Sequence, residues 1–278
     1  MGFARLRLTP PGLVGIVLVA GIFLTALLAD WVAPSSPTAM HLQFRLRAPQ
    51  WAWGTECRLG CDTLGRDMLS RVIFGARVSL LVACSVVALS ALIGIPVGLL
   101  AGYFGGRLDN LLMRLVDITL SIPPVLLAMV ATATLGAKLQ NIILALALTL
   151  WVEFARLVRA EVMVLRAAEF ITAAKALGLD DLRIILRHTL PNITHVAIVL
   201  ASLQLGITVL WEAAFSFLGL GGSTLSWGWD VAAGRQYLET AWWMSTFPGL
   251  ALFLAVIGFN LFGNWIRDVL DPRQRGTF

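Results

Sequence analysis

The sequence predicts an all-α polytopic membrane protein with about six transmembrane helices. Of its 278 residues, 58% are hydrophobic and only 13% are charged, whereas soluble domains carry about 25% charged residues. The hydrophobic residues gather in blocks of about 20, the length that a helix needs to cross a bilayer. A membrane-spanning backbone must be helical or part of a closed barrel. Because the chain lacks a series of alternating ten-residue strands, we expect helices.

The hydrophobic blocks place the six expected spans along the chain. They lie at about residues 13–33, 79–102, 113–136, 140–160, 194–219 and 243–266. The first block follows Arg5 and Arg7 and is longer than a signal-peptide core, so we expect an uncleaved span. Six spans put both termini on one side, and that side holds thirteen of the 21 Lys and Arg residues if it is cytoplasmic. The positive-inside preference therefore favours cytoplasmic termini.

This orientation divides the chain into five parts. They are a cytoplasmic N-terminus at 1–12, the first span at 13–33, an outer loop at 34–78, a five-helix core at 79–266 with a polar cytoplasmic segment at 156–192, and a cytoplasmic C-terminus at 267–278. Most arginines behind the net charge of +5 lie at the ends of apolar blocks. This placement favours anchoring in the bilayer over nucleic-acid binding.

The second expected span carries small residues at strict four-residue spacing. Ser90, Gly94, Gly98 and Gly102 fall on one helix face. Such a stripe lets another helix approach closely in a membrane. We expect packing within one bundle, with dimerisation of subunits as the alternative. Pro96 lies in the same span and predicts a kink.

Three acidic residues lie at or inside expected spans. Asp117 and Glu153 are near the cytoplasmic ends, where Arg114 and Arg156 favour structural ion pairs. Glu212 lies deeper, beside an aromatic residue. Because a charge inside the membrane is costly and usually faces a cavity or a partner, Glu212 is a candidate pathway residue. A structural role for Glu212 stays equally open.

Two cysteines lie in the outer loop at 34–78. Cys57 and Cys61 face an oxidising compartment in this orientation, so a disulfide is the favoured state, ahead of free thiols. A metal site is the last alternative, because no histidine or further cysteine nearby completes four ligands. Cys84 lies in an apolar block and is expected to pack there.

The polar segment at 156–192 is too polar to span and too rich in helix formers to be a mere linker. Residues 162–177 predict one helix, and Gly178 can adopt the positive φ that ends it. Asp180 or Asp181 can cap a second helix over 182–190. Its expected apolar face consists of Leu182, Ile185, Leu186 and Leu190, and Pro191 is expected to end it. This helix could lie on anionic lipid or insert into a groove of a partner.

The sequence contains no set of residues that predicts catalysis. The pattern G-x-x-x-x-G-K-[ST] is absent, so the chain has no P-loop. The three histidines, His41, His188 and His195, are scattered over loops and the start of a span. We therefore expect a protein without catalytic residues, a metal site or a bound cofactor of its own.

At the polar segment the sequence resembles a known element. Glu169-Phe-Ile-Thr-Ala-Ala-Lys-Ala-Leu-Gly178, followed by Arg187-His-Thr-Leu-Pro-Asn192, is similar to the EAA loop of bacterial ABC importer permeases. Two positions depart from the general pattern. Thr172 stands where Glu is usual, and His188 stands where Ile is usual. An ionic contact to the ATPase through position 172 is therefore not expected.

Further motifs narrow the resemblance to the dipeptide/oligopeptide/nickel branch and cover nearly the whole chain. They are Leu64-Gly-Arg-Asp-Met-Leu-Ser-Arg71 with Gly75-Ala-Arg77, Gly105-Gly-Arg-Leu-Asp109, Met113-Arg-Leu-Val-Asp117, Ser216-Phe-Leu-Gly-Leu-Gly221, Trp227-Gly228 and Arg267-Asp-Val-Leu-Asp-Pro-Arg273. The chain resembles the C-type permease of that branch. Cys61 stands where the branch commonly has Thr, so the cysteine pair is a local departure.

The resemblance implies a permease subunit of an ATP-driven, binding-protein-dependent importer in the bacterial inner membrane. It implies a second permease subunit, two cytoplasmic ATPase subunits that bind ATP and Mg, and a periplasmic solute-binding protein. The ATPase-coupling residues implied are Glu169, Ala173, Ala174, Gly178, Asp180, Leu182, Ile185, Leu186, Leu190 and Pro191. Peptides, nickel chelates and other small solutes remain candidates. An ion-coupled transporter acting alone and a non-transporting scaffold are the rival interpretations.

Overall fold

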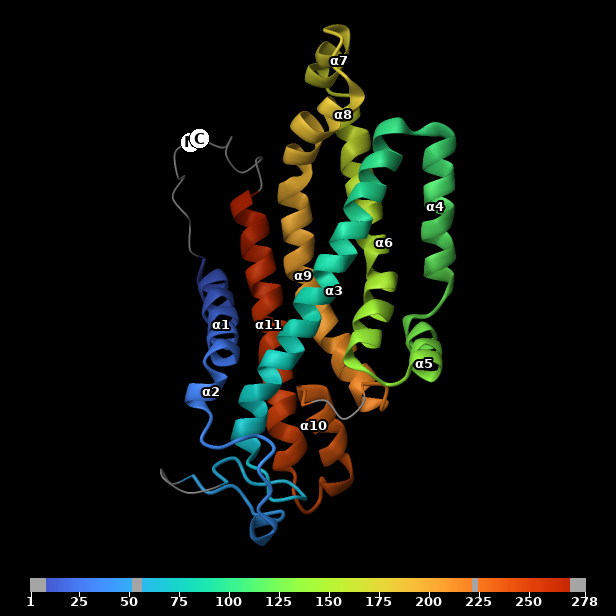
Figure 1. Ribbon diagram of the computed structural model, residues 1–278. Helices are drawn as coiled ribbons and strands as arrows, with labels where there is room; N and C mark the ends of the chain where they lie inside the picture. Colours follow the sequence, from blue (N-terminus) through green and yellow to red (C-terminus); the bar gives the residue numbers. More distant parts are fainter. Residues whose placement is uncertain (1–8, 52–56, 222–224, 271–278) are drawn as a thin grey trace.

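The computed structural model describes residues 9–51, 57–221 and 225–270 as an elongated bundle of helices (Figure 1). No strand occurs in these ranges. Helices α1 (Pro10–Leu27), α3 (Met68–Phe104), α6 (Leu139–Arg166), α9 (Leu190–Phe217) and α11 (Trp243–Leu270) are long and apolar enough to cross a membrane, α9 together with the turns before it. The all-α membrane fold that the sequence predicts is therefore confirmed.

The long helices lie roughly side by side, and α3 and α6 form the most extensive helix pair. On one flank α1 packs against α11, while α9 contacts α3, α6 and α11. The start of α1 and the end of α11 lie toward the end of the bundle from which α7 projects (Figure 1). We call this the α7 end and the opposite one the α10 end.

The third expected span, at 113–136, is broken rather than continuous. Helix α4 (Gly106–Ser121) is followed by α5 (Pro124–Leu135), and the two axes are bent by 80°. The break lies at Ile122 and Pro123, both in extended backbone. Pro123 and Pro124 cause the break, because a proline disfavours helical backbone in the residue before it and donates no backbone hydrogen bond. The sequence interpretation did not take this pair into account. The count of about six spans includes this bent pair as one.

Helix α3 begins at Met68, well before the predicted span start at 79. Asp67 caps it, because the Asp67 carboxylate accepts a 2.8 Å hydrogen bond from the Ser70 amide. The helix then continues without a break through Pro96. Its first turns therefore extend α3 into the region that the sequence assigned to the outer loop.

The stripe of small residues on α3 packs against α6. The Ser90 hydroxyl donates a 3.3 Å hydrogen bond to the Ala147 carbonyl oxygen. A Cβ atom at Gly98 would lie 2.6 Å from the Ala155 carbonyl oxygen, closer than any side chain tolerates. The prediction of close packing within one bundle is therefore confirmed.

The polar segment at 156–192 is more continuous with the spans than predicted. Helix α6 runs on to Arg166, so the expected helix at 162–177 is divided before α7 (Glu169–Ala176). Helix α8 (Asp181–Ile184) continues through a π-helical turn (η2, Ile185–Thr189) into α9. Pro191 does not end a helix, contrary to the prediction, because it lies in the first turn of α9, where its missing donor costs nothing.

The α10 end holds the short elements. They are α2 (Ala29–Val32), the 3-10 turns η1 (Leu42–Phe44) and η3 (Arg235–Tyr237), and α10 (Trp227–Gly234). Helix α10 packs among α3, α9 and α11. The Trp227 indole N–H donates a 2.8 Å hydrogen bond to the Val72 carbonyl oxygen, which fixes α10 to the start of α3.

Candidate functional site

The segment of α7, α8 and η2, residues 169–189, lies at the α7 end of the bundle, and its α7 part projects beyond the other helices (Figure 1). We call it the projecting hairpin. A Schellman motif ends α7: the Gly178 amide donates to the Lys175 carbonyl oxygen, and the Leu179 amide donates to that of Ala174. Gly178 has a φ of 78°, as the sequence predicts for the residue after this helix.

The second arm of the hairpin is capped and anchored to the bundle. The Asp180 carboxylate accepts a 3.1 Å hydrogen bond from the Leu182 amide, which confirms the predicted cap. The Tyr103 hydroxyl, at the end of α3, donates a 2.6 Å hydrogen bond to Asp181. The Lys175 ammonium lies 4.8 Å from the centre of the Tyr103 ring. One residue of α3 therefore contacts both arms of the hairpin.

The base of the hairpin shares an apolar core with the spans. Ile171 and Ala174 of α7 are buried together with Ile184 and Ile185 of the second arm. Their partners on α3, α6 and α9 include Leu99, Tyr103, Val158, Val162 and Ile193. Because interiors are close-packed, a displacement of the hairpin must move these helices as well.

The outer surface of the hairpin exposes four large apolar side chains. Phe170, Leu177, Leu182 and Leu186 have exposed fractions of 45%, 80%, 62% and 52%. We call them the apolar patch. The predicted apolar face is corrected here, because Ile185 is only 6% exposed and belongs to the core instead. The π-helical turn rotates positions 185–189 away from the ordinary helical spacing, which the sequence interpretation had assumed.

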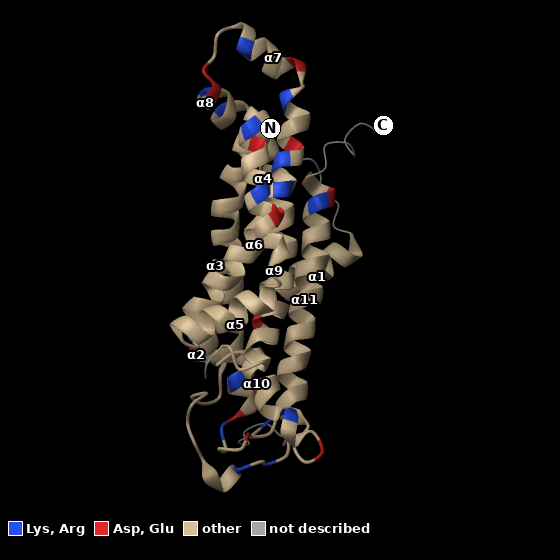
Figure 2. Ribbon diagram, turned by 90° about the vertical axis from the view of Figure 1, so that its right-hand side faces the viewer, with Lys and Arg blue, Asp and Glu red and all other residues tan. Residues whose placement is uncertain are grey.

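The other predicted coupling residues divide in the same way. Ala174 is buried, whereas Glu169, Ala173, Gly178, Asp180 and Pro191 are exposed and Leu190 is half-buried. Figure 2 shows charged residues gathered toward both ends of the bundle, and the projecting hairpin carries both signs. The hairpin surface is thus apolar at four positions and charged around them, as is typical of a protein–protein contact.

Glu212, the predicted pathway candidate, is fully buried in α9. Its carboxylate accepts hydrogen bonds from the Ser216 hydroxyl at 2.8 Å and the Ser79 hydroxyl at 3.2 Å. Ser226, which caps α10, bonds the same carboxylate. These donors connect α3, α9 and α10 through one side chain. Through these contacts Glu212 has a structural role. A role of Glu212 in the solute pathway stays a prediction.

The expected ion pairs of Asp117 and Glu153 are not present among the described residues. The Glu153 carboxylate accepts a hydrogen bond from the Gln204 amide of α9 instead of pairing with Arg156. Asp117 is exposed on α4 and has no ion pair with Arg114. Sequence proximity predicted these pairs wrongly, because a partner across two packed helices is invisible in the sequence.

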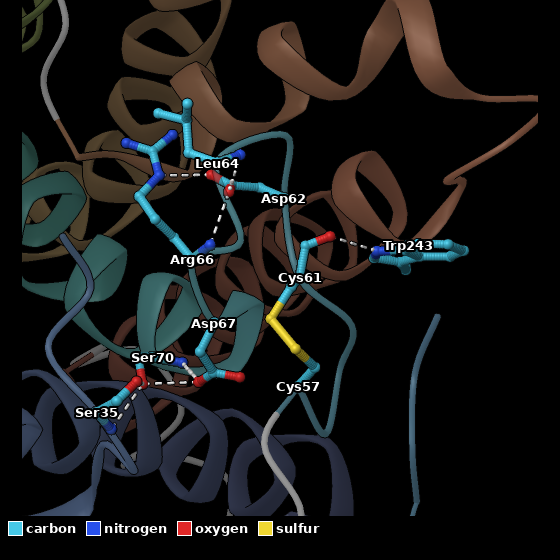
Figure 3. The surroundings of a disulfide bond; sticks show 9 residues. All are labelled: Ser35, Cys57, Cys61, Asp62, Leu64, Arg66, Asp67, Ser70 and Trp243. Atoms are coloured by element: carbon cyan, nitrogen blue, oxygen red, sulfur yellow. Dashed lines mark hydrogen bonds and ion pairs between the residues drawn. A yellow bond between two sulfur atoms is a disulfide. The ribbon is translucent and has the colours of Figure 1, made fainter. Parts of the chain in front are cut away.

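The loop at the α10 end contains the two predicted cysteines. Cys57 and Cys61 are joined by a disulfide in the structure (Figure 3). The Asp62 carboxylate accepts 2.8 Å and 2.9 Å hydrogen bonds from the Leu64 and Arg66 amides, and it pairs with the Arg66 guanidinium at 2.6 Å. The Cys61 carbonyl oxygen accepts a 3.1 Å bond from the Trp243 indole N–H, which ties the loop to α11.

A buried ion pair that the sequence interpretation missed lies beside this loop. Arg71 of α3 and Asp230 of α10 pair directly, and each side chain is 3% exposed. Arg71 also donates a 3.4 Å hydrogen bond to the Pro37 carbonyl oxygen. Burial raises the pKa of the Asp230 carboxyl, and the Arg71 guanidinium opposes that rise. A second missed pair joins Arg159 of α6 to Asp109 of α4 at 2.6 Å.

Comparison with known families identifies the core of the chain. Residues 94–276 match the family described as "Binding-protein-dependent transport system inner membrane component". This match includes α4 to α11 and hence the projecting hairpin.

Curated relatives match nearly the whole chain. The di/tripeptide transport system permease protein DppC of Pseudomonas aeruginosa is 42% identical over 95% of this chain and 88% of the relative. The dipeptide transport system permease protein DppC of Alkalihalophilus pseudofirmus is 39% identical, over 98% and 89%. The probable D,D-dipeptide transport system permease protein DdpC of Escherichia coli is also 39% identical, over 98% and 90%.

A solved structure shares the fold. A chain of the MetNI methionine ABC transporter, in inward-facing conformations, has a TM-score of 0.58 and 24% identity, and the match covers 73% of this chain and 97% of that one. Taken with the family match and the relatives, this likeness places a permease fold around the projecting hairpin. The chain belongs to the family of binding-protein-dependent transport system inner membrane components, as the permease component of an ABC importer.

Proposed function

We propose that this permease is one half of a translocation path for peptides or related small solutes. The support is that relatives matching 95% or more of the chain are named as permeases for dipeptides or di- and tripeptides. The second half of the path is a second, different permease subunit. The solute arrives on a separate binding protein.

The projecting hairpin is the element that docks on an ATPase subunit. The observation that carries this proposal is the apolar patch, which stays exposed on a hairpin that is itself locked into the bundle. Isolated exposed leucines need no explanation, but four large apolar side chains on one short projection indicate a contact surface. Of the two alternatives, a partner groove is favoured over a lipid surface because the hairpin extends away from the spans (Figure 1).

The contact residues within the predicted coupling set are the exposed ones. Leu182 and Leu186 enter the ATPase groove, and Asp180 holds the start of their helix. Ala174 and Ile185 act from inside, because they pass the displacement of the hairpin to α3 and α6. Thr172 is exposed, so its lack of charge leaves docking to apolar contacts.

Docking of an ATPase on the projecting hairpin also implies the other subunits of the complex and the orientation of this chain in the membrane. Two ATPase subunits bind ATP and Mg, and this chain binds no cofactor and performs no catalysis. The α7 end is cytoplasmic, and so are both termini. The α10 end faces the periplasm, where the binding protein docks, and the protein is a multi-pass component of the bacterial inner membrane.

Co-purification of the ATPase tests the docking proposal. In the complete complex, Leu182→Asp with Leu186→Asp should abolish recovery of the ATPase with this permease, because two carboxylates would be buried in an apolar groove. Leu42→Asp is the matched control, since Leu42 is 68% exposed but lies at the α10 end. Full recovery of the ATPase with the double variant would contradict the proposal.

A further inference from the structure

A polar contact joins the middle turns of α6 and α9. Glu153 lies at the midpoint of the 28-residue helix α6, and Gln204 lies at that of the 28-residue helix α9. The Gln204 amide NH2 donates a hydrogen bond to the Glu153 carboxylate. Thr208 follows one turn later on the same face of α9. We call Glu153, Gln204 and Thr208 the midplane polar site.

Two acceptors of this site have no partner among the described residues. They are the side-chain carbonyl oxygen of Gln204 and the hydroxyl oxygen of Thr208. Both residues are buried, with exposed fractions of 1% and 0%. Buried polar atoms are nearly always hydrogen-bonded, so two such atoms without a partner, one helical turn apart, require an explanation. An additional group that donates hydrogen bonds there would supply it.

The Glu153 side chain cannot face lipid. It is exposed on the surface of this chain, and no described Lys or Arg pairs with it. A carboxylate on a membrane-spanning helix is costly to expose to lipid and faces a cavity or a partner instead. Gln204 stabilises one of its oxygens but brings no positive charge. The face that carries Glu153 therefore borders a water-filled path or a group of opposite charge.

We propose that the midplane polar site binds the ammonium group of the solute during its passage, with Glu153 as the contact residue. The inference rests on the proposed function, because a peptide carries such an ammonium at its amino terminus. Glu153 is the exposed member of the site, so its carboxylate is the group that an ammonium can reach, and the buried Gln204 amide holds that carboxylate in place. A single carboxylate binds weakly enough to release the solute, as conduction requires.

Uptake by the complete complex in proteoliposomes, with its binding protein and a dipeptide, tests this inference. Glu153→Gln should reduce uptake about tenfold, because a neutral amide replaces the carboxylate that bonds the ammonium. Stimulation of the ATPase by the loaded binding protein should remain, since the hairpin is unchanged. Glu153→Asp should recover part of the uptake, and Glu161→Gln, on the same helix, should match wild type.

A second measurement tests the position of Glu153. In a Cys84→Ser background, Glu153→Cys should react with a membrane-impermeant, cationic thiol reagent, and dipeptide transport should slow that reaction. Leu148→Cys is the control, because Leu148 is 51% exposed on the same helix and a thiol facing lipid does not react.

The outcomes separate this inference from the function on which it rests. Wild-type complexes that take up no dipeptide would overturn both. Normal uptake by Glu153→Gln, or absence of labelling at Glu153→Cys, would overturn the inference alone. Loss of the second permease subunit from the Glu153→Gln complex would also overturn it, because Glu153 would then be an ion-pair residue between subunits.

Discussion

The Tyr103 hydroxyl, at the last turn of α3, donates a 2.6 Å hydrogen bond to the Asp181 carboxylate at the first turn of α8. This bond joins the longest helix of the bundle to the projecting hairpin. The Tyr103 ring also packs in the apolar core beneath the hairpin. Tyr103 is therefore placed to transmit motion of the hairpin into α3.

We predict that Tyr103→Phe weakens coupling without preventing assembly. The phenylalanine ring keeps the packing and the Lys175 contact but loses the bond to Asp181, which contributes about 1.5–3 kcal/mol when one partner is charged. The number of dipeptides taken up per ATP hydrolysed should fall, while recovery of the ATPase with the permease stays at the wild-type level. An unchanged ratio of uptake to hydrolysis would show that this bond does not transmit motion.

Gly178→Val should uncouple ATP hydrolysis from transport. At a φ of 78° a β-branched side chain is strained by about 1–2 kcal/mol or more, so the Schellman turn opens and the two arms separate. The expected result is retained membrane insertion with loss of uptake and of ligand-stimulated ATPase activity.

Gly21→Val is the matched control for that substitution. Gly21 also has open space around its Cβ position, but it lies inside α1 without a positive φ. Normal insertion and uptake are expected for it. If Gly178→Val behaved like Gly21→Val, the turn would have no role in coupling.

The Cys57–Cys61 disulfide should be found in the protein isolated from its membrane. Mass mapping without reduction should recover the two cysteines in one linked peptide, and only Cys84 should react with an alkylating reagent under denaturing conditions. Two further alkylated thiols would refute the bond.

Local features of the fold were predictable from the sequence because their causes are local. The turn at Gly178 and the cap at Asp180 depend on residues within four positions, and both are confirmed. The four-residue spacing from Ser90 to Gly102 predicted close packing of this helix face, but it did not identify α6 as the partner. The number of spans was predictable because each hydrophobic block of about 20 residues is a local feature of the sequence.

Features that depend on tertiary contacts were not predictable in this way. Pro191 looked like a helix end, but a π-helical turn lets α8 run into α9. Glu153 looked like a partner of nearby Arg156, but its bond crosses to Gln204, far along the chain. Within the hairpin, burial of Ile185 against α3 and α6 separates it from Leu182 and Leu186, which one sequence pattern had grouped together.

The Arg71–Asp230 pair gives the sharpest test of stability at the α10 end. Removing one partner of a buried ion pair leaves an uncompensated charge and costs about 3–5 kcal/mol. Arg71→Met should therefore lower the unfolding temperature in detergent clearly. The Arg77–Asp30 pair, whose side chains are 40% and 63% exposed, is the control, so Asp30→Asn should change stability by about 1 kcal/mol or less.

A double variant separates the loss of the pair from the cost of leaving one charge buried. Arg71→Met with Asp230→Leu removes both charges and fills the space with apolar atoms, so it should recover most of the stability lost by Arg71→Met alone. Limited proteolysis of the loop around Pro37 should increase in both variants, because both lose the hydrogen bond from Arg71 to the Pro37 carbonyl oxygen. A double variant as unstable as the single one would show that Arg71 stabilises this end through Pro37 and through Asp62, whose carboxylate lies 4.0 Å from the guanidinium, rather than through Asp230.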